Sequence, residues 1–521
     1  MDHEVITSYV PAGMPGAPER LFRRKVLPVM IASCFACGPA FANPTGAQVV
    51  SGQVSISSTG NVLTVTNSPG SIINWNSFSI NPGELTQFLQ QNSSSAVLNR
   101  IVGQSPSQIF GALQSNGQVF LINPNGIIFG ANSKVSVSGL VASTLDISNS
   151  DFAAGKLNFA AGTTAGNIVN QGNLTTPSGG LIYLIAPQVQ NSGVITSPQG
   201  EVLLAAGHSV QLVDGADPNI QVVVSAPTDQ AVNLGNIVAQ GGKIGLYGAL
   251  VNQSGTVSAD SAVVGQDGKV VFKSSTTTTL SGNSVTSANN SAGEGGTVYL
   301  LGPQVTLTDS AQVEANGQTG GGTVYVGGAF HGADASIVNS SRTYIGANTS
   351  ISANAVTNGT GGNVAVWSDV ATYMYGDISA KGGAQGGNGG YVETSGKNYL
   401  DFRGIVDLTA PKGTTGNLLL DPYTVTINDT SAGEITPTGG NPVSYTSGAN
   451  SYVSASSINT QLATANVVVQ AGAGGGGDVT VVSNNLNWNT TNILTLAASA
   501  NVNINGSIRS EERRVGKECV P

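Results

Sequence analysis

Short runs of alternating apolar and polar residues, separated by glycine or asparagine, recur along most of the chain. The run Gly180–Leu184 is matched 20 residues later by Gly200–Leu204, and Gly172–Leu174 is matched 21 residues later by Gly193–Ile195. Successive residues of a strand point to opposite sides, so Val, Ile and Leu of such a run face a core while Ser, Thr and Asn face solvent. The pattern predicts many short strands joined by tight corners.

The length of the repeating unit changes along the chain, but the order of strands and glycine corners within each unit stays the same. We equate Pro187–Val189 with His208–Val210, and we interpret the 42 residues between Gly193 and Gly235 as two periods. Later units repeat at 26 and 28 residues. One unit cannot bury its apolar side alone, whereas stacked units can. We therefore predict an all-β chain folded as a right-handed parallel β-helix; a β-sandwich with accidental glycine repeats would not explain this constant order.

Composition divides the chain further. Residues 43–160 hold most of the early aromatic residues and are less regular, which suits a domain that caps the exposed end of the solenoid. We assign residues 161–422 to β-helix repeats and residues 423–508 to the start of further β-rich repeats. Residues 509–521 contain RSEERRVGKEC, which resembles the translation of a sequencing adapter, and we expect an artefact there; a genuine charged tail is the alternative.

The N-terminus has the pattern of an export signal. Arg20–Lys25 is basic, Val26–Cys37 is apolar but too short to span a bilayer, and Ala40–Ala42 is a small-x-small site. We predict a signal peptide over residues 1–42 with cleavage between Ala42 and Asn43. A buried helix of a cytosolic domain would not account for the basic flank and the Ala-x-Ala end.

Charge and cysteine usage narrow the class of protein. The 521 residues include 70 Gly, only 9% are charged, and the net charge is −9. An acidic protein is a poor ligand for nucleic acid or anionic lipid. The three cysteines, Cys34, Cys37 and Cys519, lie in the predicted signal and in the suspected artefact. The predicted mature chain therefore has none, which suits a chain that crosses an oxidising periplasm unfolded.

Candidate catalytic chemistry is sparse. His208 and His331 lie in repeats, and we interpret them as surface residues because no His, Cys or Asp cluster has the sequence spacing of a metal site. Gly382–Gly390 lacks the Lys-Ser/Thr end of a phosphate loop. We predict no catalytic, cofactor or metal residues and no enzyme. A β-helical enzyme acting on polysaccharide is an alternative, although basic residues are few.

Four ordered motifs carry a family resemblance. They are INWNSFSI (Ile73–Ile80), SAVLNRIVG (Ser95–Gly103), SNGQVFLINPNGIIFG (Ser115–Gly130) and GLVASTLDIS (Gly139–Ser148). Together they resemble the secretion domain of two-partner secretion exoproteins, the filamentous-haemagglutinin family with its high-molecular-weight adhesin branch. The resemblance implies an adhesin-like exoprotein of a Gram-negative bacterium, secreted or held at the cell surface. The N-terminal part of a contact-dependent toxin is a further alternative.

The resemblance also implies partners and a site. The partners are an outer-membrane transporter with periplasmic docking domains and an unidentified host or cell-surface receptor. The sequence Asn123-Pro124-Asn125-Gly126 lies between two apolar runs, where proline fixes φ and Asn-Gly supplies positive φ, so we predict a rigid strand-turn-strand corner. A turn with no further role is the alternative. The residues assigned to transporter recognition and folding are Asn99, Arg100, Asn123, Pro124, Asn125, Gly126 and Ile127.

Overall fold

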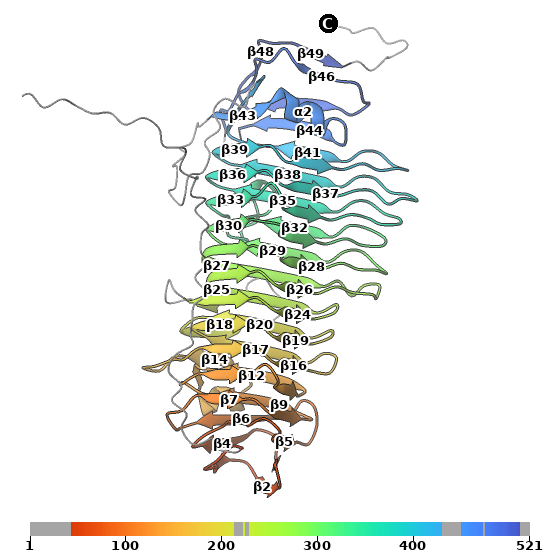
Figure 1. The fold of residues 1–521 in the computed structure, drawn as a ribbon. Coiled ribbons are helices and arrows are strands. Elements are labelled where there is room, and N and C mark those ends of the chain that lie inside the picture. Colours follow the sequence, from red (N-terminus) through yellow and green to blue (C-terminus); the bar gives the residue numbers. More distant parts are fainter. Residues whose placement is uncertain (1–42, 213–221, 224–228, 430–449, 473–474, 511–521) are drawn as a thin grey trace, which may run out of the picture. The chain divides into compact units, whose positions relative to one another are not determined.

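Strands make up most of the computed structural model, which describes residues 43–212, 222–223, 229–429, 450–472 and 475–510 (Figure 1). Helical structure in this part of the chain is limited to α1 (Asn149–Ala153), α2 (Ala455–Gln461) and the 3-10 turn η1 (Phe330–Gly332). No helix among the described residues is long and apolar enough to cross a membrane. The all-β prediction is confirmed, whereas the predicted signal peptide and residues 511–521 lie outside the described residues.

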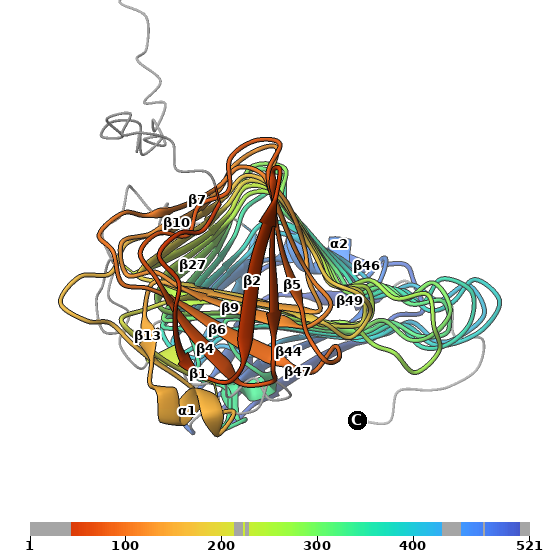
Figure 2. The same ribbon diagram turned by 90° about the horizontal axis from the view of Figure 1, so that it is seen from below.

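A typical coil in the described part of the chain contains three strands. In the second coil these are β6 (Ala96–Ile101), β7 (Ser107–Ile109) and β8 (Ala112–Ser115). The chain then returns as β9 (Gln118–Ile122), which lies parallel to β6 with Ala96 opposite Gln118. We call the stacks that contain β6, β7 and β8 faces A, B and C; Figure 2 looks along the stack and shows them around a common interior. The chain is a parallel β-helix, as predicted.

Face A is the stack on which the sites described below are built. Neighbouring strands of face A pair in parallel. Two of them, β25 (Lys243–Gln253) and β27 (Lys269–Leu280), are long enough to continue around the corner into face B. Its strands are β4 (Ser71–Trp75), β6, β9, β12 (Gly139–Ser143), β17 (Leu181–Ala186), β20 (Glu201–Ala206), β25 (Lys243–Gln253), β27 (Lys269–Leu280), β29 (Thr297–Leu301), β32 (Thr323–Val326), β35 (Asn363–Ser368), β38 (Tyr391–Gly396), β41 (Asn417–Leu420), β44 (Asn466–Ala471) and β47 (Leu494–Ala498).

Glycine repeats mark corners where two coils touch through their backbones. A Cβ atom placed on Gly235 would lie 2.2 Å from the carbonyl oxygen of Gly193 in the coil before, and one on Gly255 would lie 2.1 Å from that of Gly235. Since a larger residue would force the coils apart, the spacing of these glycines records the coil length directly. The inward apolar side chains of the three faces form one continuous buried cluster.

A row of buried amides follows one of these corners. Asn170 Nδ2 donates to Asn191 Oδ1 at 2.7 Å, Asn191 Nδ2 donates to Asn233 Oδ1 at 2.8 Å, and Asn233 Nδ2 donates to Gln253 Oε1 at 2.8 Å. All four side chains are buried, so each depends on the next coil for its partner. We call this row the amide ladder.

An antiparallel cap closes the N-terminal end. The strand β1 (Gln48–Ser51) pairs antiparallel with β4, and β2 (Val54–Thr59) pairs antiparallel with β3 (Val62–Asn67). Parallel stacking on face C begins where β3 pairs with β5 (Leu85–Leu89). The predicted cap is present, and the stacked faces run without interruption past residue 160, so the domain boundary placed there stays a prediction.

One part of the predicted register is wrong. The strand β24 (Asn236–Val238) pairs directly with β19 (Val194–Thr196), so the 42 residues between them are one coil and not two. The extra length is an excursion in which β21 (Ser209–Leu212) pairs antiparallel with β14 (Leu157–Ala160). His208–Val210 imitates a repeat in sequence, but its strand covers apolar side chains on the outer side of face A instead of joining the stack.

Candidate transporter-recognition site

The predicted corner at Asn123 is a tight turn between β9 and β10 (Ile127–Phe129). Gly126 N donates to the Asn123 carbonyl at 3.1 Å, and Gly126 adopts a φ of 116°. The Asn123 side chain is fully buried, and its Oδ1 accepts from Asn125 N at 3.0 Å. These bonds hold the turn in one conformation, as the sequence predicts.

The turn also joins the coils on either side. Asn123 Nδ2 donates to Ser105 O and to Ser107 Oγ at 3.0 Å each, in the coil before. In the coil after, Asn167 O accepts from Ile127 N at 3.0 Å. Loss of the Asn123 side chain would therefore leave the buried Ser107 hydroxyl, in the coil before, without this donor.

Asn125 differs from its prediction. We expected positive φ at Asn125, but the left-handed conformation is confined to Gly126 within this turn. The Asn125 side chain instead donates to Gly103 O at 2.9 Å. The requirement at this position is a hydrogen-bond donor that reaches the preceding coil, because the glycine after it already supplies the reversal.

Asn99 and Arg100 lie on β6 and point to opposite sides of face A. Asn99 is buried in the core, where its Oδ1 accepts from Trp75 Nε1 at 2.9 Å and its Nδ2 donates to Phe120 O at 3.2 Å. It therefore links three successive coils through the interior. An indole N–H buried in an apolar core needs such a partner, which explains a polar residue inside this coil.

Arg100 reaches outward and fastens the covering layer. Its guanidinium donates to Asp146 Oδ1 at 2.9 Å, Asn149 Oδ1 at 2.9 Å and Ile147 O at 2.6 Å, and the side chain is 17% exposed. The three acceptors belong to the segment formed by β13 (Asp146–Ile147) and α1. A single guanidinium that bonds to all three holds this segment in place. The apolar cluster beneath this layer includes Leu98 and Phe152.

Asn43, the predicted first residue of the mature chain, is built into the cap. Its backbone nitrogen donates to Glu84 Oε2 at 3.0 Å, and its side-chain oxygen accepts from Thr86 Oγ1 at 2.9 Å. Glu84 Oε2 also accepts from Asn81 N at 2.9 Å. Sequence inspection missed the role of Glu84, because the partner lies far from it along the chain. Ala42 lies outside the described residues.

The predicted site residues do not converge on one cleft. Asn99 lies in the core, Arg100 lies under the outer layer, and the turn from Asn123 to Ile127 lies at the corner between faces A and B. What they share is that each bonds to a neighbouring coil or layer. Trp75 and Asp146 complete these contacts, and both lie within the motifs that carry the family resemblance.

The two histidines are partly exposed, as predicted, but each meets a buried carboxylate. His208 is 43% exposed with its Nδ1 3.0 Å from Asp229 Oδ1. His331 is 50% exposed with its Nδ1 3.7 Å from Glu393 Oε1 and 3.8 Å from Asp421 Oδ2. The interpretation from sequence missed this second group, because its members come from three separate coils.

Comparison with known proteins agrees with this geometry. The family model for the TPS secretion domain matches residues 40–262. The crystal structure of the HMW1 secretion domain from Haemophilus influenzae is 36% identical, with a TM-score of 0.66, and the match covers 71% of this chain and 100% of that one.

Two curated relatives share part of this chain. A heme/hemopexin-binding protein of Haemophilus influenzae is 27% identical over 248 residues, which is 45% of this chain and 27% of the relative. Another heme/hemopexin-binding protein of Haemophilus influenzae is 41% identical over 75 residues, which is 14% of this chain and 8% of the relative. The matched part thus spans about a quarter or less of these relatives.

Proposed function

Because the chain belongs to the family of two-partner secretion exoproteins, we propose that it is exported by a partner transporter of the outer membrane and acts outside the cell as an adhesin-like protein. In this proposal the N-terminal coils are both the export signal and the template on which the later coils fold. The observation that carries it is the continuity of the stack: the capped first coils present an open strand edge in the register that every later coil repeats.

Stacking supplies a driving force that needs no ATP. A coil that buries about 150 Å² of apolar surface gains about 4 kcal/mol before its loss of chain entropy is counted. Each coil that has emerged and folded then opposes backward movement of the chain. A template that folds first is required, since a lone coil has no partner for its apolar side.

The transporter must recognise the chain before the coils fold. In an extended chain, the alternating residues of β2 and β3 would be free to add as a strand to a sheet edge of the periplasmic docking domains. Folding of the cap then withdraws these strands into their antiparallel pair. Signal cleavage after Ala42 belongs to the same proposal, because it would place the new amino group of Asn43 on the Glu84 carboxylate.

Adhesion is supported by the resemblance to the high-molecular-weight adhesin branch. The polysaccharide-acting enzyme and the contact-dependent toxin have no observation in their favour among the described residues. A binding assay of the exported protein on host or bacterial cells tests the adhesin part. Cell binding no greater than that of an unrelated exported protein would contradict it.

The export part is tested by expressing the full chain with and without its transporter and measuring the protein in the medium. We expect export only with the transporter. Asn123→Val should reduce export to roughly a tenth, because valine cannot make the four hydrogen bonds of Asn123. The matched control is Asn316→Val, which removes an outer asparagine from a later coil and should leave export unchanged. Equal export of both variants would contradict a role for the turn.

A further inference from the structure

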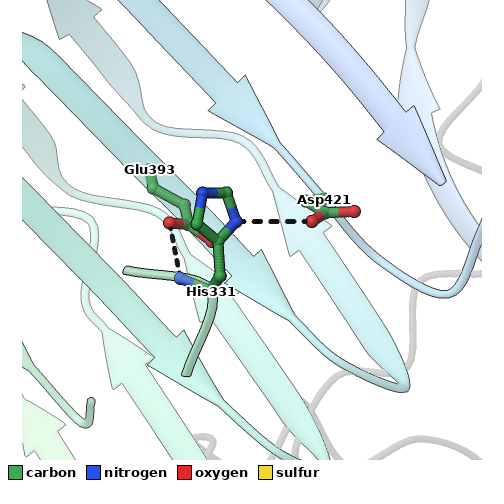
Figure 3. A group of neighbouring side chains, drawn as sticks. All are labelled: His331, Glu393 and Asp421. Carbon is green, nitrogen blue, oxygen red and sulfur yellow. Dashed lines mark hydrogen bonds and ion pairs between the residues drawn. The ribbon is translucent and has the colours of Figure 1, made fainter. Parts of the chain in front are cut away.

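Three side chains from separate coils converge on the outer side of face A. His331 belongs to η1 in the segment between β32 and β33 (Arg342–Ile345), Glu393 belongs to β38, and Asp421 follows β41 directly. Figure 3 shows the imidazole between the two carboxylates. One ligand atom from each residue lies within 4.8 Å of the other two.

The two acids are buried but poorly satisfied. The exposed fractions of the Glu393 and Asp421 side chains are 0% and 2%. Glu393 Oε1, the oxygen that faces His331, has no hydrogen-bond partner, and neither has Asp421 Oδ1. Their ion pairs within the described residues are both with the half-exposed His331. Two buried carboxylates beside one imidazole are costly to keep ionised, so their charge is relieved either by protonation or by a bound cation.

The backbone holds His331 in place over the acids. His331 has a φ of 58°, which a residue with a side chain rarely adopts, and its backbone N–H donates to Glu393 Oε2 at 2.9 Å. Gly332 beside it packs so closely on Trp367 that an added Cβ would lie 2.5 Å from the indole nitrogen. The strained residue is therefore positioned by its neighbours and directs its ring toward the carboxylates.

We propose that His331, Glu393 and Asp421 bind one divalent metal ion of the zinc class. Ligands of a tetrahedral zinc ion lie about 2.0–2.1 Å from the metal and hence about 3.3–3.4 Å from one another. The distances of 3.7 and 3.8 Å from His331 Nδ1 to the two carboxylate oxygens approach this value. All three ligand atoms lie within 4.8 Å of one another, so binding would draw the carboxylate oxygens closer together, and water would supply the fourth ligand. Imidazole with two carboxylates suits zinc better than the all-oxygen sets that calcium and magnesium prefer.

The bound ion would fasten the η1 segment across three coils. One ligand comes from the segment after β32, and the others come from β38 and from the end of β41, which are added later in the stack. The site is complete only when these coils have stacked. The ion therefore reports, and stabilises, a correctly assembled middle region, independently of the export proposed above.

Isothermal titration calorimetry of the purified protein with zinc chloride at neutral pH tests the proposal. We expect one ion per chain. His331→Gly removes the ligand and also the strained φ, so the variant should fold, and Glu393→Gln keeps the shape of the side chain. Each should weaken zinc binding by about 100-fold. The matched control is His208→Ala, since His208 and Asp229 form a pair of only two ligands, and its zinc binding should equal that of the wild type.

X-ray absorption and circular dichroism test whether these three residues are the ligands. X-ray absorption of the zinc-loaded protein should show nitrogen and oxygen ligands from this set, with the nitrogen contribution lost in His331→Gly. Absence of zinc binding by the wild type would overturn the proposal, as would equal binding by wild type and His331→Gly. Circular dichroism of both variants, compared with the wild type, checks that lost binding does not come from unfolding.

Discussion

The coils of residues 43–160 and those of residues 243–407 share one backbone plan but are held together differently. In the first region the coils are joined by contacts that occur once, such as Trp75 with Asn99, Arg100 with Asp146, and the turn at Asn123. An antiparallel layer, β13, β14 and β21, covers the outer side of face A there.

In the second region, one kind of contact recurs from coil to coil. Asn289 Oδ1 accepts from Asn316 N, Asn316 Oδ1 accepts from Asn354 N, and Asn354 Oδ1 accepts from Lys381 N, each at 2.8 Å. The stacked loops that carry these asparagines lie side by side at one corner (Figure 1). Repeated contacts extend a stack that already exists, whereas unrepeated contacts define where it starts. We therefore expect the first region to control the onset of folding and the second to add stability in increments.

The largest expected difference comes from two buried aromatic residues, Trp75 of the first region and Phe272 of the second. Alanine at either position should cost about 3–5 kcal/mol of local stability through the cavity left behind. Trp75→Ala should abolish export because the template coil fails, while Phe272→Ala should leave more than half of the protein exported. Immunoblots of the medium measure this, and equal loss of export in both variants would remove the distinction between the regions.

Two arginines give the next comparison. Arg100→Ala removes three hydrogen bonds from a mostly buried guanidinium and should lower the stability of the covering layer by about 2 kcal/mol. Arg403→Ala breaks a bidentate pair with the buried Asp401 and a stacking contact with the half-buried Tyr375. The cost should be smaller, about 1 kcal/mol, because the Arg403 side chain is 37% exposed and Tyr375 Oη still donates to Asp401 Oδ2 at 2.7 Å. Amide hydrogen exchange in β14 and β39 (Tyr399–Phe402) reports each effect locally. A larger effect at Arg403 would contradict the ranking.

Cleavage of the signal gives a third, smaller effect. If the mature chain begins at Asn43, its charged amino group meets Glu84, and Glu84→Gln should destabilise the mature protein by about 1 kcal/mol more than the uncleaved precursor. The thermal midpoints of both forms measure this difference. The control is Asp309→Asn, whose carboxylate accepts from Gly282 N in the second region and should act equally in both forms. N-terminal sequencing that starts elsewhere than Asn43 would contradict the cleavage site.

The smallest effect concerns pH. Burial alone would raise the pKa of Asp407, but hydrogen bonds from Lys381 and Thr409 bring this pKa below its ordinary 3.8. A lowered carboxyl pKa in the folded state means that the stabilisation is complete above pH 3.8 and is lost as pH falls toward the lowered pKa. Asp407→Asn should therefore cost less than about 1 kcal/mol at pH 7 and nothing at the acid end. Amide hydrogen exchange of β40 (Ile405–Asp407), measured at pH 7 and well below pH 3.8, tests this expectation.

Sequence reasoning predicted most of the stack, because glycine at a corner and alternation in a strand are local consequences of coil geometry. It placed His208–Val210 in the stack wrongly, since a strand of a covering layer alternates in the same way as a strand of a face. It assigned positive φ to Asn125 from a general turn preference, although Gly126 alone suffices. The group at His331 was not predictable, because sequence spacing within one coil carries no information on ligands supplied by three.

The amide ladder has a consequence for accuracy of assembly. A coil that docks two residues out of step keeps its apolar side chains inward but would bury Asn191 or Asn233 against an aliphatic neighbour, at a cost of about 1–3 kcal/mol for each unsatisfied amide. The apolar interior alone discriminates weakly between such offsets, since valine, isoleucine and leucine replace one another at small cost. We therefore expect the ladder to select the aligned register during assembly, because a misaligned coil with unsatisfied amides detaches more readily than an aligned one.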